Sequence, residues 1–554
     1  MNAMIMAVVV LLPILGGALI PLLPFRKRVQ MEFYIEGLVL LNSILVIWML
    51  FHRPEEVFIL FRLTGNLSVG FQLDGLGTVF AGIVSVLWPL ATLYAFEYMK
   101  HEGHEKYFFM FYTITYGVPL GIALADDILT LYCFYEMLTL VTLPLIMHTL
   151  SREAILASRT YLYYSLGGAA FAFIGVIFIL IYGNNAQFIP GGVLDLVKIG
   201  DKTNLLVFVY VLCFMGFSVK AAMWPFGAWL PKAGVAPTPV TALLHAVAVV
   251  KAGAFAVMRV TYYCFGTEFL RGTWAQTVLM IFVIFTIVYG CSRALKETHL
   301  KRRLAYSTMS NLSYILFGVV LMSPLGLVGA LSHMVFHAVM KICSFFCAGA
   351  VIYKSGRNYI HELDGMGRKM PKVFGAFTVS AFALMGVPGL CGFISKWNLA
   401  KAAVENPHPL AIFGVAALLI SALLTAIYML TIVVRAFFPG KDFDYHTLDG
   451  ITDPTWKMLL PLGIFVVLMV LFGLHSAPIV SALSKLAAAA VERGGENDDR
   501  CIFRCARIFS VSRRAAGGCG GEKACGLPGF SGRHRSGVRI PDRVWAVCRT
   551  VVCR

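Results

Sequence analysis

The chain has 554 residues, of which 59% are hydrophobic and only 14% are charged, and its mean hydropathy is strongly positive. A water-soluble globular protein of this length needs more polar side chains to cover its surface. The composition therefore excludes a soluble protein and indicates an integral membrane protein. We attribute the net charge of +17 to membrane topology and not to nucleic-acid binding.

Apolar runs long enough to cross a bilayer recur along the chain. A helical span needs about 17 to 25 residues, and runs of this length predict an all-α, polytopic membrane protein with about fourteen transmembrane helices. The first run lacks a preceding basic segment, so we expect a retained helix and not a signal peptide. The runs are 3–24, 31–51, 75–99, 107–125, 128–149, 159–182, 204–229, 236–258, 274–292, 303–322, 326–353, 372–398, 410–437 and 457–476.

The basic residues between the spans predict the orientation. Connections after odd-numbered spans hold 21 Lys and Arg, and those after even-numbered spans hold 7. Loops rich in Lys and Arg stay in the cytoplasm. We therefore expect a multi-pass protein of the cytoplasmic (inner) membrane with both termini on the outer side.

Two predicted helices contain residues that break helices. Pro225 lies in the span at 204–229, and Pro388 and Gly389 lie in the span at 372–398. A proline at membrane depth is tolerated only beside protein or a water-filled cavity, and paired broken helices indicate an ion pathway between inverted repeats. We therefore predict discontinuous seventh and twelfth helices within two inverted five-helix repeats. The expected parts are N-terminal helices (1–106), a first repeat (107–258), a second repeat (274–438), a last helix (457–476) and a tail (494–554).

Protonatable side chains stand near the middle of several spans. Each costs a few kcal/mol to insert, so each is a functional candidate. The candidates for a proton pathway are Glu136, Lys220, His245, Lys251, His333, His337, Lys341 and Lys396.

Structural interpretations of these residues remain open. Glu136 and a lysine can form a static buried pair, Lys220 and Lys396 can extend toward a helix end, and His245 can be a core histidine. At span ends, acidic residues are expected to cap helices or lie at the interface. These are Asp74, Glu97, Asp126 and Asp127.

The stretch HMVFHAVMK (333–341) carries two histidines and a lysine at a spacing of four. On a helix, residues four apart drift by about 40° and rise by about 6 Å per step, so the three form one stripe. Histidine titrates near neutral pH and can pass protons. Alone, the stripe is also compatible with a metal site or with two core histidines.

The tail from Gly494 differs from the rest of the chain. It is rich in Arg, Gly and Cys and has no apolar period. A lipid-binding or partner-binding tail and a metal or disulfide module are alternatives, but we favour a frameshifted reading of a GC-rich gene. We expect it to be disordered. No CxxC pair exists in the chain, which argues against an iron–sulfur or zinc site in the spans.

The segment SVKAAMWPFGAWLPKAGVAPTPVTALLHAVAVVKAG (218–253) resembles the signature of antiporter-like, proton-translocating membrane subunits. These occur in complex I, in multisubunit Na⁺/H⁺ antiporters (as their D-type subunit) and in membrane-bound hydrogenases. Further similar motifs are LDGLGTVFAG (73–82), DDILTLYCFYEMLTL (126–140), LKRRLAYSTMSNLSYILFG (300–318), HMVFHAVMKICSFFCAGAVIY (333–353) and GVPGLCGFISKW (386–397).

The resemblance implies a fourteen-helix fold with a polar chain along the membrane midplane. Asn311 stands where relatives often have His or Gln. The residues that match the family's pathway are Glu136 on helix 5, Lys220 on helix 7, Lys251 with His245 on helix 8, His333, His337 and Lys341 on helix 11, and Lys396 on helix 12.

We hypothesise a proton path along these residues. Burial lowers the proton affinity of a lysine and a nearby carboxylate raises it, so Glu136 is expected to modulate Lys220. The proton then passes through His245 and Lys251 to the stripe, and Lys396 gates one side. Because residues six apart on an ideal helix point about 240° apart, His245 and Lys251 need a water, a local bulge or different partners.

Three functions compete. The first is an ion-translocating, non-redox subunit of a redox-driven complex, NADH-quinone oxidoreductase-like or hydrogenase-like, with other membrane subunits and the lipid bilayer as partners. The second is the D-type subunit of a multisubunit Na⁺/H⁺ antiporter, and the third is a freestanding permease. The chain has no nucleotide loop, metal cluster or flavin motif, so we expect no cofactor and no catalytic centre of its own. The transported ion is expected to be H⁺, with Na⁺ as the alternative.

Overall fold

The computed structural model describes residues 3–65 and 67–491, and nearly all of their regular structure is helical. The predicted tail from Gly494 lies outside the described residues. The N-terminal elements are α1 (Met4–Leu19), α2 (Arg28–His52), β1 (Phe58–Thr64), β2 (Leu67–Phe71), α3 (Gly75–Tyr98) and α4 (Glu105–Ala123).

The middle of the chain contains helices interrupted by unwound segments. Its elements are α5 (Ile128–Ile146), α6 (Arg152–Tyr182), α7 (Leu196–Ile199), α8 (Thr203–Ser218), α9 (Trp229–Lys232), α10 (Thr238–Ala246), α11 (Val249–Arg259) and the π-helical turn η5 (Val260–Phe265). The C-terminal elements are α12 (Thr267–Leu270), α13 (Trp274–Lys296), α14 (Leu300–Val320), α15 (Pro324–Ser355), α16 (Met366–Lys369), α17 (Pro371–Met385), α18 (Cys391–Val404), α19 (Ala411–Phe437), α20 (Trp456–Leu474) and α21 (Ala477–Val491).

Among the described residues, ten helical segments are long and apolar enough to cross a membrane. Three shorter apolar helices, α1, α17 and α21, accompany them. Large apolar side chains remain exposed along several of the long helices, for example Leu419 at 68% and Leu423 at 64% on α19. In water these faces would be unfavourable, whereas acyl chains solvate them. The chain is therefore a multi-pass membrane protein.

The prediction of an entirely helical chain missed one hairpin. β1 and β2 pair antiparallel between α2 and α3, with Phe58 opposite Phe71 and Arg62 opposite Ser68. Phenylalanine, valine and isoleucine favour strands, and Gly65 follows β1 with φ of 54°, a conformation that glycine adopts freely. The strands are too short to appear as helical spans, so a search for apolar spans does not reveal the hairpin.

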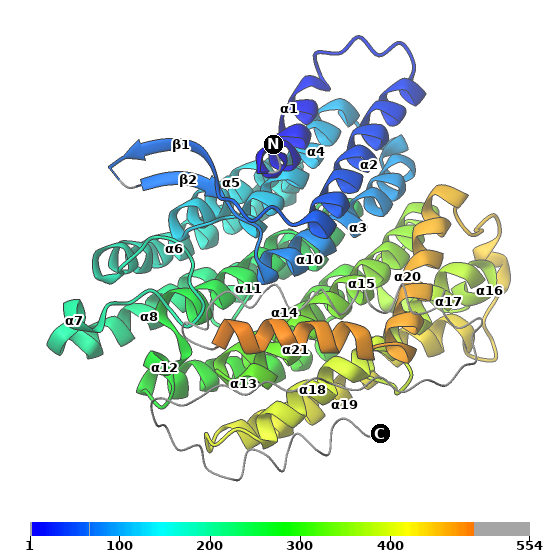
Figure 1. Cartoon of the computed structure of the whole chain (residues 1–554). Coiled ribbons are helices and arrows are strands. Elements are labelled where there is room, and N and C mark those ends of the chain that lie inside the picture. The colour runs from blue at the N-terminus through cyan, green and yellow to red at the C-terminus, as the bar shows by residue number, and fades with distance from the viewer. Residues whose placement is uncertain (1–2, 66, 492–554) are drawn as a thin grey trace, which may run out of the picture. The chain divides into compact units, whose positions relative to one another are not determined.

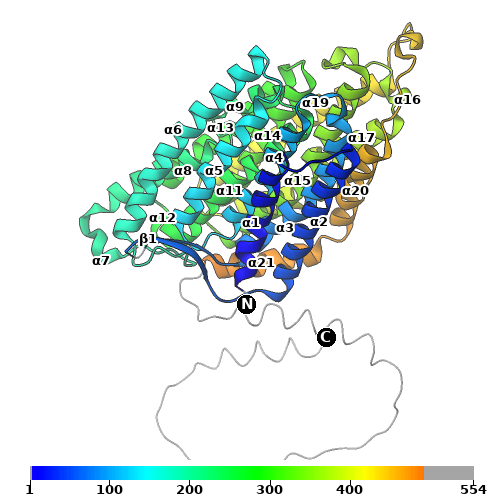
Figure 2. The ribbon, with the colours of Figure 1, turned by 90° about the horizontal axis from the view of Figure 1, so that it is seen from above.

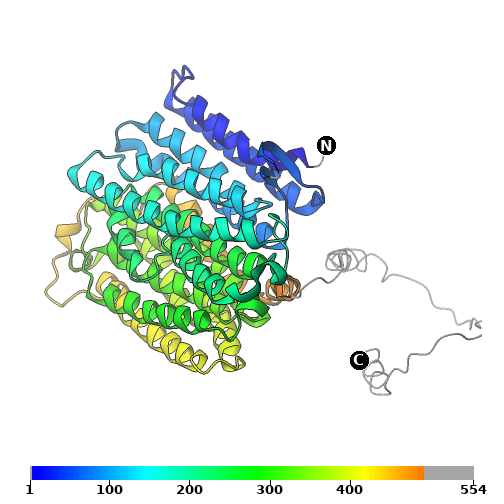
Figure 3. The same ribbon diagram turned by 90° about the vertical axis from the view of Figure 1, so that its left-hand side faces the viewer.

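The helix α15 lies at the centre of the fold. It packs against α3, α10, α14, α17, α18, α20 and α21, and its side chains are almost all buried. Figures 1 and 3 show that the N-terminal helices lie at one end of the row of helices and α19 at the other, with α15 between them. The stripe expected at 333–341 therefore lies in the interior, not on the lipid-facing surface.

The two ends of the bundle helices carry different connections. Figure 2 shows the N-terminus, β1, α7, α12 and α21 at one end and α9 and α16 at the opposite end. The Ala-rich segment after the last apolar run forms α21, which crosses the bundle helices (Figures 1 and 2) and packs against α15. The first end therefore carries the hairpin and the long helix α21 beside short helices, whereas the opposite end carries the short helices α9 and α16.

Candidate functional site

Lys220 lies in an unwound segment between α8 and α9. α8 ends at Ser218, and Trp229, the first residue of α9, donates its indole N–H to the carbonyl of Val219 at 2.8 Å. The Lys220 side chain is fully buried. Its ammonium donates to the carbonyl oxygen of Tyr135 on α5 and stands 3.4 Å from the centroid of the Tyr135 ring. The break thus removes the lysine from a regular helix and directs it onto α5.

Glu136 follows Tyr135 on α5 but does not bond Lys220. Its Oε1 atom is buried and accepts no hydrogen bond from the described residues, and the two side chains interact only electrostatically across a gap. The open alternative of a static, hydrogen-bonded pair of Glu136 and Lys220 therefore has no support in this conformation, and modulation of Lys220 by Glu136 stays a prediction. The reason for the gap is geometric: consecutive residues of a helix point about 100° apart, and the lysine approaches the Tyr135 side.

A second break separates His245 from Lys251. A local bulge here was one of the three possibilities that the sequence left open. α10 ends at Ala246 and α11 begins at Val249, and the amides of Val247 and Ala248 both donate to the carbonyl of Leu243, at 3.0 and 2.8 Å. This local bulge changes the angle between the two side chains. Neither ring nitrogen of His245 has a hydrogen-bond partner among the described residues.

Lys251 reaches the central helix directly. Its Nζ atom lies 2.8 Å from Nδ1 of His337 on α15, and both side chains are fully buried. An ammonium has only donors, so it pairs with the free lone pair of a neutral imidazole. This bond joins a residue of the first group of helices, 107–258, to the predicted stripe.

The stripe is present on α15 and wholly buried. The rings of His333 and His337 lie 5.6 Å apart between centroids, and His333 Nδ1 lies 2.9 Å from Ser395 Oγ. Lys341 donates to Ser307 Oγ at 2.7 Å and to the carbonyl of Leu304 at 3.2 Å. In residues 3–65 and 67–491, no three His, Cys, Asp or Glu side chains gather as metal ligands, so the metal interpretation of the stripe has no support.

Lys396 follows the second expected break. α17 ends at Met385 and α18 begins at Cys391, and Gly386 and Gly389 have φ of 93° and 89°. The partly buried Lys396 folds back and donates to the carbonyls of Leu384, at 2.6 Å, and Met385, at 3.0 Å.

Those carbonyls belong to the C-terminal end of α17, where the helix dipole attracts a cation. The ammonium also stands 5.4 Å from the centroid of the Tyr314 ring. Gly386 permits this contact, because a Cβ atom there would lie 3.1 Å from Lys396 Cδ.

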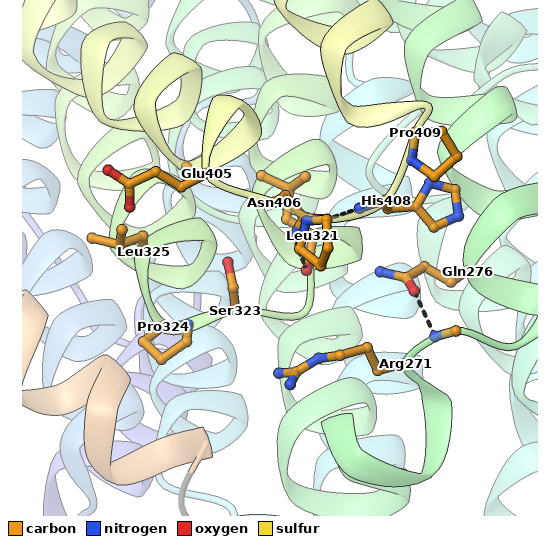
Figure 4. A pocket seen from close by; sticks show the side chains of 13 residues that line it. Arg271, Gln276, Leu321, Ser323, Pro324, Leu325, Glu405, Asn406, His408 and Pro409 are labelled. Atoms are coloured by element: carbon orange, nitrogen blue, oxygen red, sulfur yellow. Dashed lines mark hydrogen bonds between the residues drawn. The ribbon is translucent and has the colours of Figure 1, made fainter.

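A cleft of about 640 Å³ lies beside the end of α18. Its walls come from three connections, α12 to α13, α14 to α15 and α18 to α19. Figure 4 shows Arg271 and Gln276 on one side and Glu405 on the other. Arg271 donates to the carbonyl of Met322 at 2.6 Å and Asn406 to that of Leu321 at 2.8 Å. A mainly apolar cleft with a few polar side chains therefore meets the helix that carries Lys396.

Several residues that contact the predicted lysines and histidines were missed. They are Tyr135, Tyr314, Ser307 and Ser395. Each is a hydroxyl residue in an apolar run, and such residues commonly bond their own helix. The only sequence signal was the position of Tyr135 beside Glu136; the other three depend on contacts between helices. Two of the acidic residues cap helices as expected: Asp74 accepts from the amide of Gly77 at 2.8 Å, and Asp127 from that of Thr130 at 2.6 Å.

The matches to known families cover most of the pathway. A family described as NADH:quinone oxidoreductase/Mrp antiporter, TM, matches residues 125–425. A second, described as NADH-Ubiquinone oxidoreductase (complex I), chain 5 N-terminus, matches residues 62–109. The first match spans more than half of the chain and includes every residue of the candidate pathway.

Individual relatives agree with the family matches. The NAD(P)H-quinone oxidoreductase chain 4-3 of Nostoc is 26% identical over 80% of this chain and 80% of its own length. The A/B subunit of a probable K⁺/H⁺ antiporter from Rhizobium meliloti is 31% identical over 78% of this chain and 43% of its own length. In fold, the chain is similar to one chain of the membrane-bound sulfane sulfur reductase, an archaeal respiratory membrane complex, with a TM-score of 0.75, 23% identity, and coverage of 88% and 98% of the two chains. The protein belongs to the NADH:quinone oxidoreductase/Mrp antiporter family of antiporter-like membrane subunits.

Proposed function

We propose that this chain moves protons across the membrane as an antiporter-like subunit of a redox-driven complex. The bond between Lys251 and His337 carries the proposal, because it joins two parts of the pathway that lie far apart in the sequence. Both partners can hold or release a proton. Other membrane subunits and the lipid bilayer are the proposed partners.

The proposed path begins at Lys220 and is modulated by Glu136. The proton moves toward Lys251, with His245 and water on the way because the break at Val247 and Ala248 leaves no direct contact. From Lys251 it passes to His337 and along the stripe. Side chains at hydrogen-bond distance transfer protons fast enough for catalysis, and the fully buried lysines are shielded from competing solvent.

Lys396 is the proposed gate to one side of the membrane. Ala402, which lines the cleft, is six residues further along α18, a rise of about 9 Å. The cleft lies among connections after even-numbered spans, which the positive-inside rule assigns to the outer side. We therefore propose release through this cleft and both termini on the outer side.

The proposed domain organisation follows the same pattern. It comprises about fourteen spans, N-terminal helices at 1–106, inverted repeats at 107–258 and 274–438, and a last helix at 457–476. The breaks after Ser218 and Met385 support the repeats, because each stands before a buried or partly buried lysine.

The alternative is a component of a cation/proton antiporter powered by the proton gradient alone. The 31% identity to the K⁺/H⁺ antiporter relative favours it. The respiratory relatives favour the redox-driven complex, because one of them matches over four fifths of both chains. Vesicles distinguish the two: addition of an electron donor acidifies them only if the complex is redox-driven, whereas an antiporter needs an imposed gradient of Na⁺ or K⁺.

The test uses membrane vesicles that contain the whole complex and a pH-sensitive dye. Lys220→Ala is expected to lower proton transport by about 100-fold, the effect of removing one proton-transfer group. Lys232→Ala is the matched control, since this lysine lies on α9 just beyond the same break but is exposed. Full transport by Lys220→Ala, with normal amounts of the complex, would overturn the proposal.

A further inference from the structure

A buried network of hydroxyl groups and one thiol lies beside the stripe. Its members come from α13, α14 and α19, and each is at most 1% exposed. The proposed pathway meets them where Lys341 contacts Ser307 and where His333 and Lys396 lie beside the Tyr314 ring. They are Cys291, Ser307, Ser310, Tyr314, Ser421, Thr425 and Tyr428.

One half of the network begins at Lys341. Its ammonium donates to Ser307 Oγ at 2.7 Å, and the same oxygen accepts the hydroxyl proton of Tyr428 at 2.7 Å. The Tyr428 hydroxyl lies 3.1 Å from Thr425 Oγ1. Three helices, α15, α14 and α19, are therefore joined by consecutive hydrogen bonds.

The other half ends beside Lys396. The hydroxyl of Tyr314 donates to Ser421 Oγ at 2.7 Å, and Ser310 Oγ lies 3.1 Å from the same atom. The Tyr314 ring lies 5.1 Å from the His333 ring and 5.4 Å from the Lys396 ammonium, measured to its centroid. The Tyr314 ring therefore lies beside both the stripe and Lys396, the proposed gate.

Cys291 joins the two halves. Its sulfur lies 2.9 Å from Ser421 Oγ and 3.7 Å from Thr425 Oγ1. Thr425 donates its own proton to the carbonyl of Ser421 at 2.7 Å and not to the Ser421 hydroxyl. The thiol of Cys291 therefore links the hydroxyl oxygens of Ser421 and Thr425. A hydroxyl that only capped its own helix would need none of these contacts between helices.

We propose that this network is a second proton route from Lys341 to Lys396, which bypasses His333. The inference rests on the proposed function, because it adds a branch to the same pathway. The histidine branch needs intervening water, since Nε2 of His333 and Nε2 of His337 have no hydrogen-bond partner among the described residues. The hydroxyl branch has consecutive contacts from Lys341 to Tyr314.

The order of the groups suits proton transfer. Cysteine, tyrosine and lysine have unperturbed pKa values of about 8.5, 10 and 10.4, whereas aliphatic hydroxyls are far weaker acids. Along the route, Lys341, Tyr428, Cys291 and Tyr314 alternate with Ser307, Thr425 and Ser421. Each weak hydroxyl can accept one proton as it gives up its own, so it is never left charged.

The transfer balances in protons and charge. The neutral amine of Lys396, after leaving the carbonyls of α17, takes the hydroxyl proton of Tyr314. The resulting phenolate is refilled from Cys291 through Ser421, and the thiolate from Tyr428 through Thr425. Tyr428 recovers its proton from the Lys341 ammonium through Ser307. One proton leaves Lys341, one arrives at Lys396, and every other group returns to its starting form.

The test measures proton transport by the whole complex in vesicles for Cys291→Ala, for His333→Ala and for the double variant. Loss of a transfer group from a single path costs about 100-fold or more. With two branches, each single variant keeps more than about a tenth of the transport, and the double variant falls well below the product of the single effects. A double variant equal to His333→Ala would overturn the inference, as would a Cys291→Ala variant that is inactive alone.

Two further variants separate conduction from packing. Cys213→Ala removes an equally buried thiol, which donates to the carbonyl of Ala172 at 3.8 Å and lies outside the network. In the His333→Ala background it should leave the remaining transport unchanged. Cys291→Ser keeps the hydrogen bonds but supplies a weaker acid, so in that background we expect transport between those of cysteine and alanine. Full transport by the serine variant would indicate a structural role and overturn the inference.

An infrared measurement gives a readout independent of rate. The S–H stretch lies in a region free of other protein bands. The band that Cys291→Ala removes should shift when the complex turns over, because the thiol then exchanges its proton. A band unchanged during turnover would contradict the route. If Lys220→Ala pumps normally, the proposed function itself fails; if Lys220→Ala is inactive and the double variant equals His333→Ala, only this inference fails.

Discussion

Lys220 and Lys396 follow a helix break in the same way but are held by different atoms. Each stands over a tyrosine ring, Lys220 at 3.4 Å from that of Tyr135 and Lys396 at 5.4 Å from that of Tyr314. Lys220 donates to one carbonyl of a neighbouring helix and senses the charge of Glu136. Lys396 donates to two carbonyls at the end of its own broken partner helix.

The difference assigns different tasks to the two groups of helices. A carboxylate can gain or lose a full charge, so Glu136 can change how strongly Lys220 holds its proton. Carbonyl dipoles are fixed, so Lys396 depends on what arrives from the stripe. In the proposed path, the first group, 107–258, therefore initiates a transfer, and the second, 274–438, passes it on. The predictions below test this asymmetry from the largest expected effect to the smallest.

The largest effect is expected where the two groups meet. Lys251→Met removes the bond to His337 and leaves an apolar side chain of similar length in its place. Proton transport should fall by about 100-fold or more. Lys202→Met is the control, because this exposed lysine donates to the Tyr182 hydroxyl of α6, outside the candidate pathway. Substantial transport by Lys251→Met would show that the two groups do not communicate through this contact.

The next prediction compares two ion pairs, one that joins the end of α11 to the start of α3 and one within the second group. Arg259 is 1% exposed and bonds Asp74, so Asp74→Asn leaves a buried guanidinium without its counter-charge. Breaking such a pair costs about 3–5 kcal/mol when both partners are buried, and about 2 kcal/mol is expected here because Asp74 is partly exposed.

Asp364→Asn is the matched change in the second group. It breaks a pair with Arg435 at 3.3 Å in which both side chains are about a third or more exposed. Exposed pairs contribute about 0–1 kcal/mol. In detergent micelles, Asp74→Asn should therefore lower the free energy of unfolding clearly more than Asp364→Asn does. Equal losses would mean that burial does not decide the strength of these pairs.

Much of this architecture can be predicted from the lengths of the apolar runs and from the positions of the charged residues. Most of the long helices were predicted to within a few residues, and the breaks after Ser218 and Met385 follow from prolines and glycines that regular helices do not accommodate. The lysines and histidines of the candidate pathway were also recognisable, because an ionisable residue in an apolar run is rare. All eight candidates lie in or beside broken or buried segments.

Contacts between helices were not predictable. The direction of Lys220 toward Tyr135 and not Glu136 depends on how α8 unwinds, which no local pattern encodes. The break at Val247 and Ala248 contains no proline or glycine, so it arises from tertiary packing. The link through Cys291 joins residues more than 100 positions apart. The sequence identifies the ionisable and polar residues, but the packing of the helices determines which of them are in contact.

A smaller effect is expected at Glu136. Glu136→Gln keeps the shape of the side chain but removes its charge, while the carbonyl and ring of Tyr135 still hold Lys220. A nearby charge changes a proton affinity by about tenfold or more, so transport should fall about tenfold and its pH dependence should shift. Glu153→Gln, on the exposed first turn of α6, is the control. A loss as large as that of Lys251→Met would make the carboxylate part of the path and not a modulator.

The smallest effect compares two titratable groups just before α5 and α14. Burial, and then Asp127, raise the pKa of Asp126 to about 6; burial, and then Arg302 and Lys301, lower the pKa of His299 to about 4. Both neutral forms are thus favoured in the folded chain.

The two shifts have opposite consequences for stability. Asp126 stabilises the fold fully below the pKa of the unfolded carboxyl, and this contribution is lost as pH rises to about 6. His299 contributes above the unfolded imidazole pKa, and its contribution is lost as pH falls toward about 4. Between pH 5.5 and 7.5 the Asp126 term amounts to about 0.7 kcal/mol, half of one pKa unit. The His299 term changes in the opposite direction over nearly the same pH range, so the two terms largely cancel in the parent protein. In micelle unfolding experiments, Asp126→Asn should therefore make stability rise with pH between about 4 and 6.5, and His299→Gln should make it fall over that range. If both variants instead kept the pH dependence of stability of the parent protein, burial would not control the charge of Asp126 or of His299. The two helix groups would then not differ in how pH affects their stability.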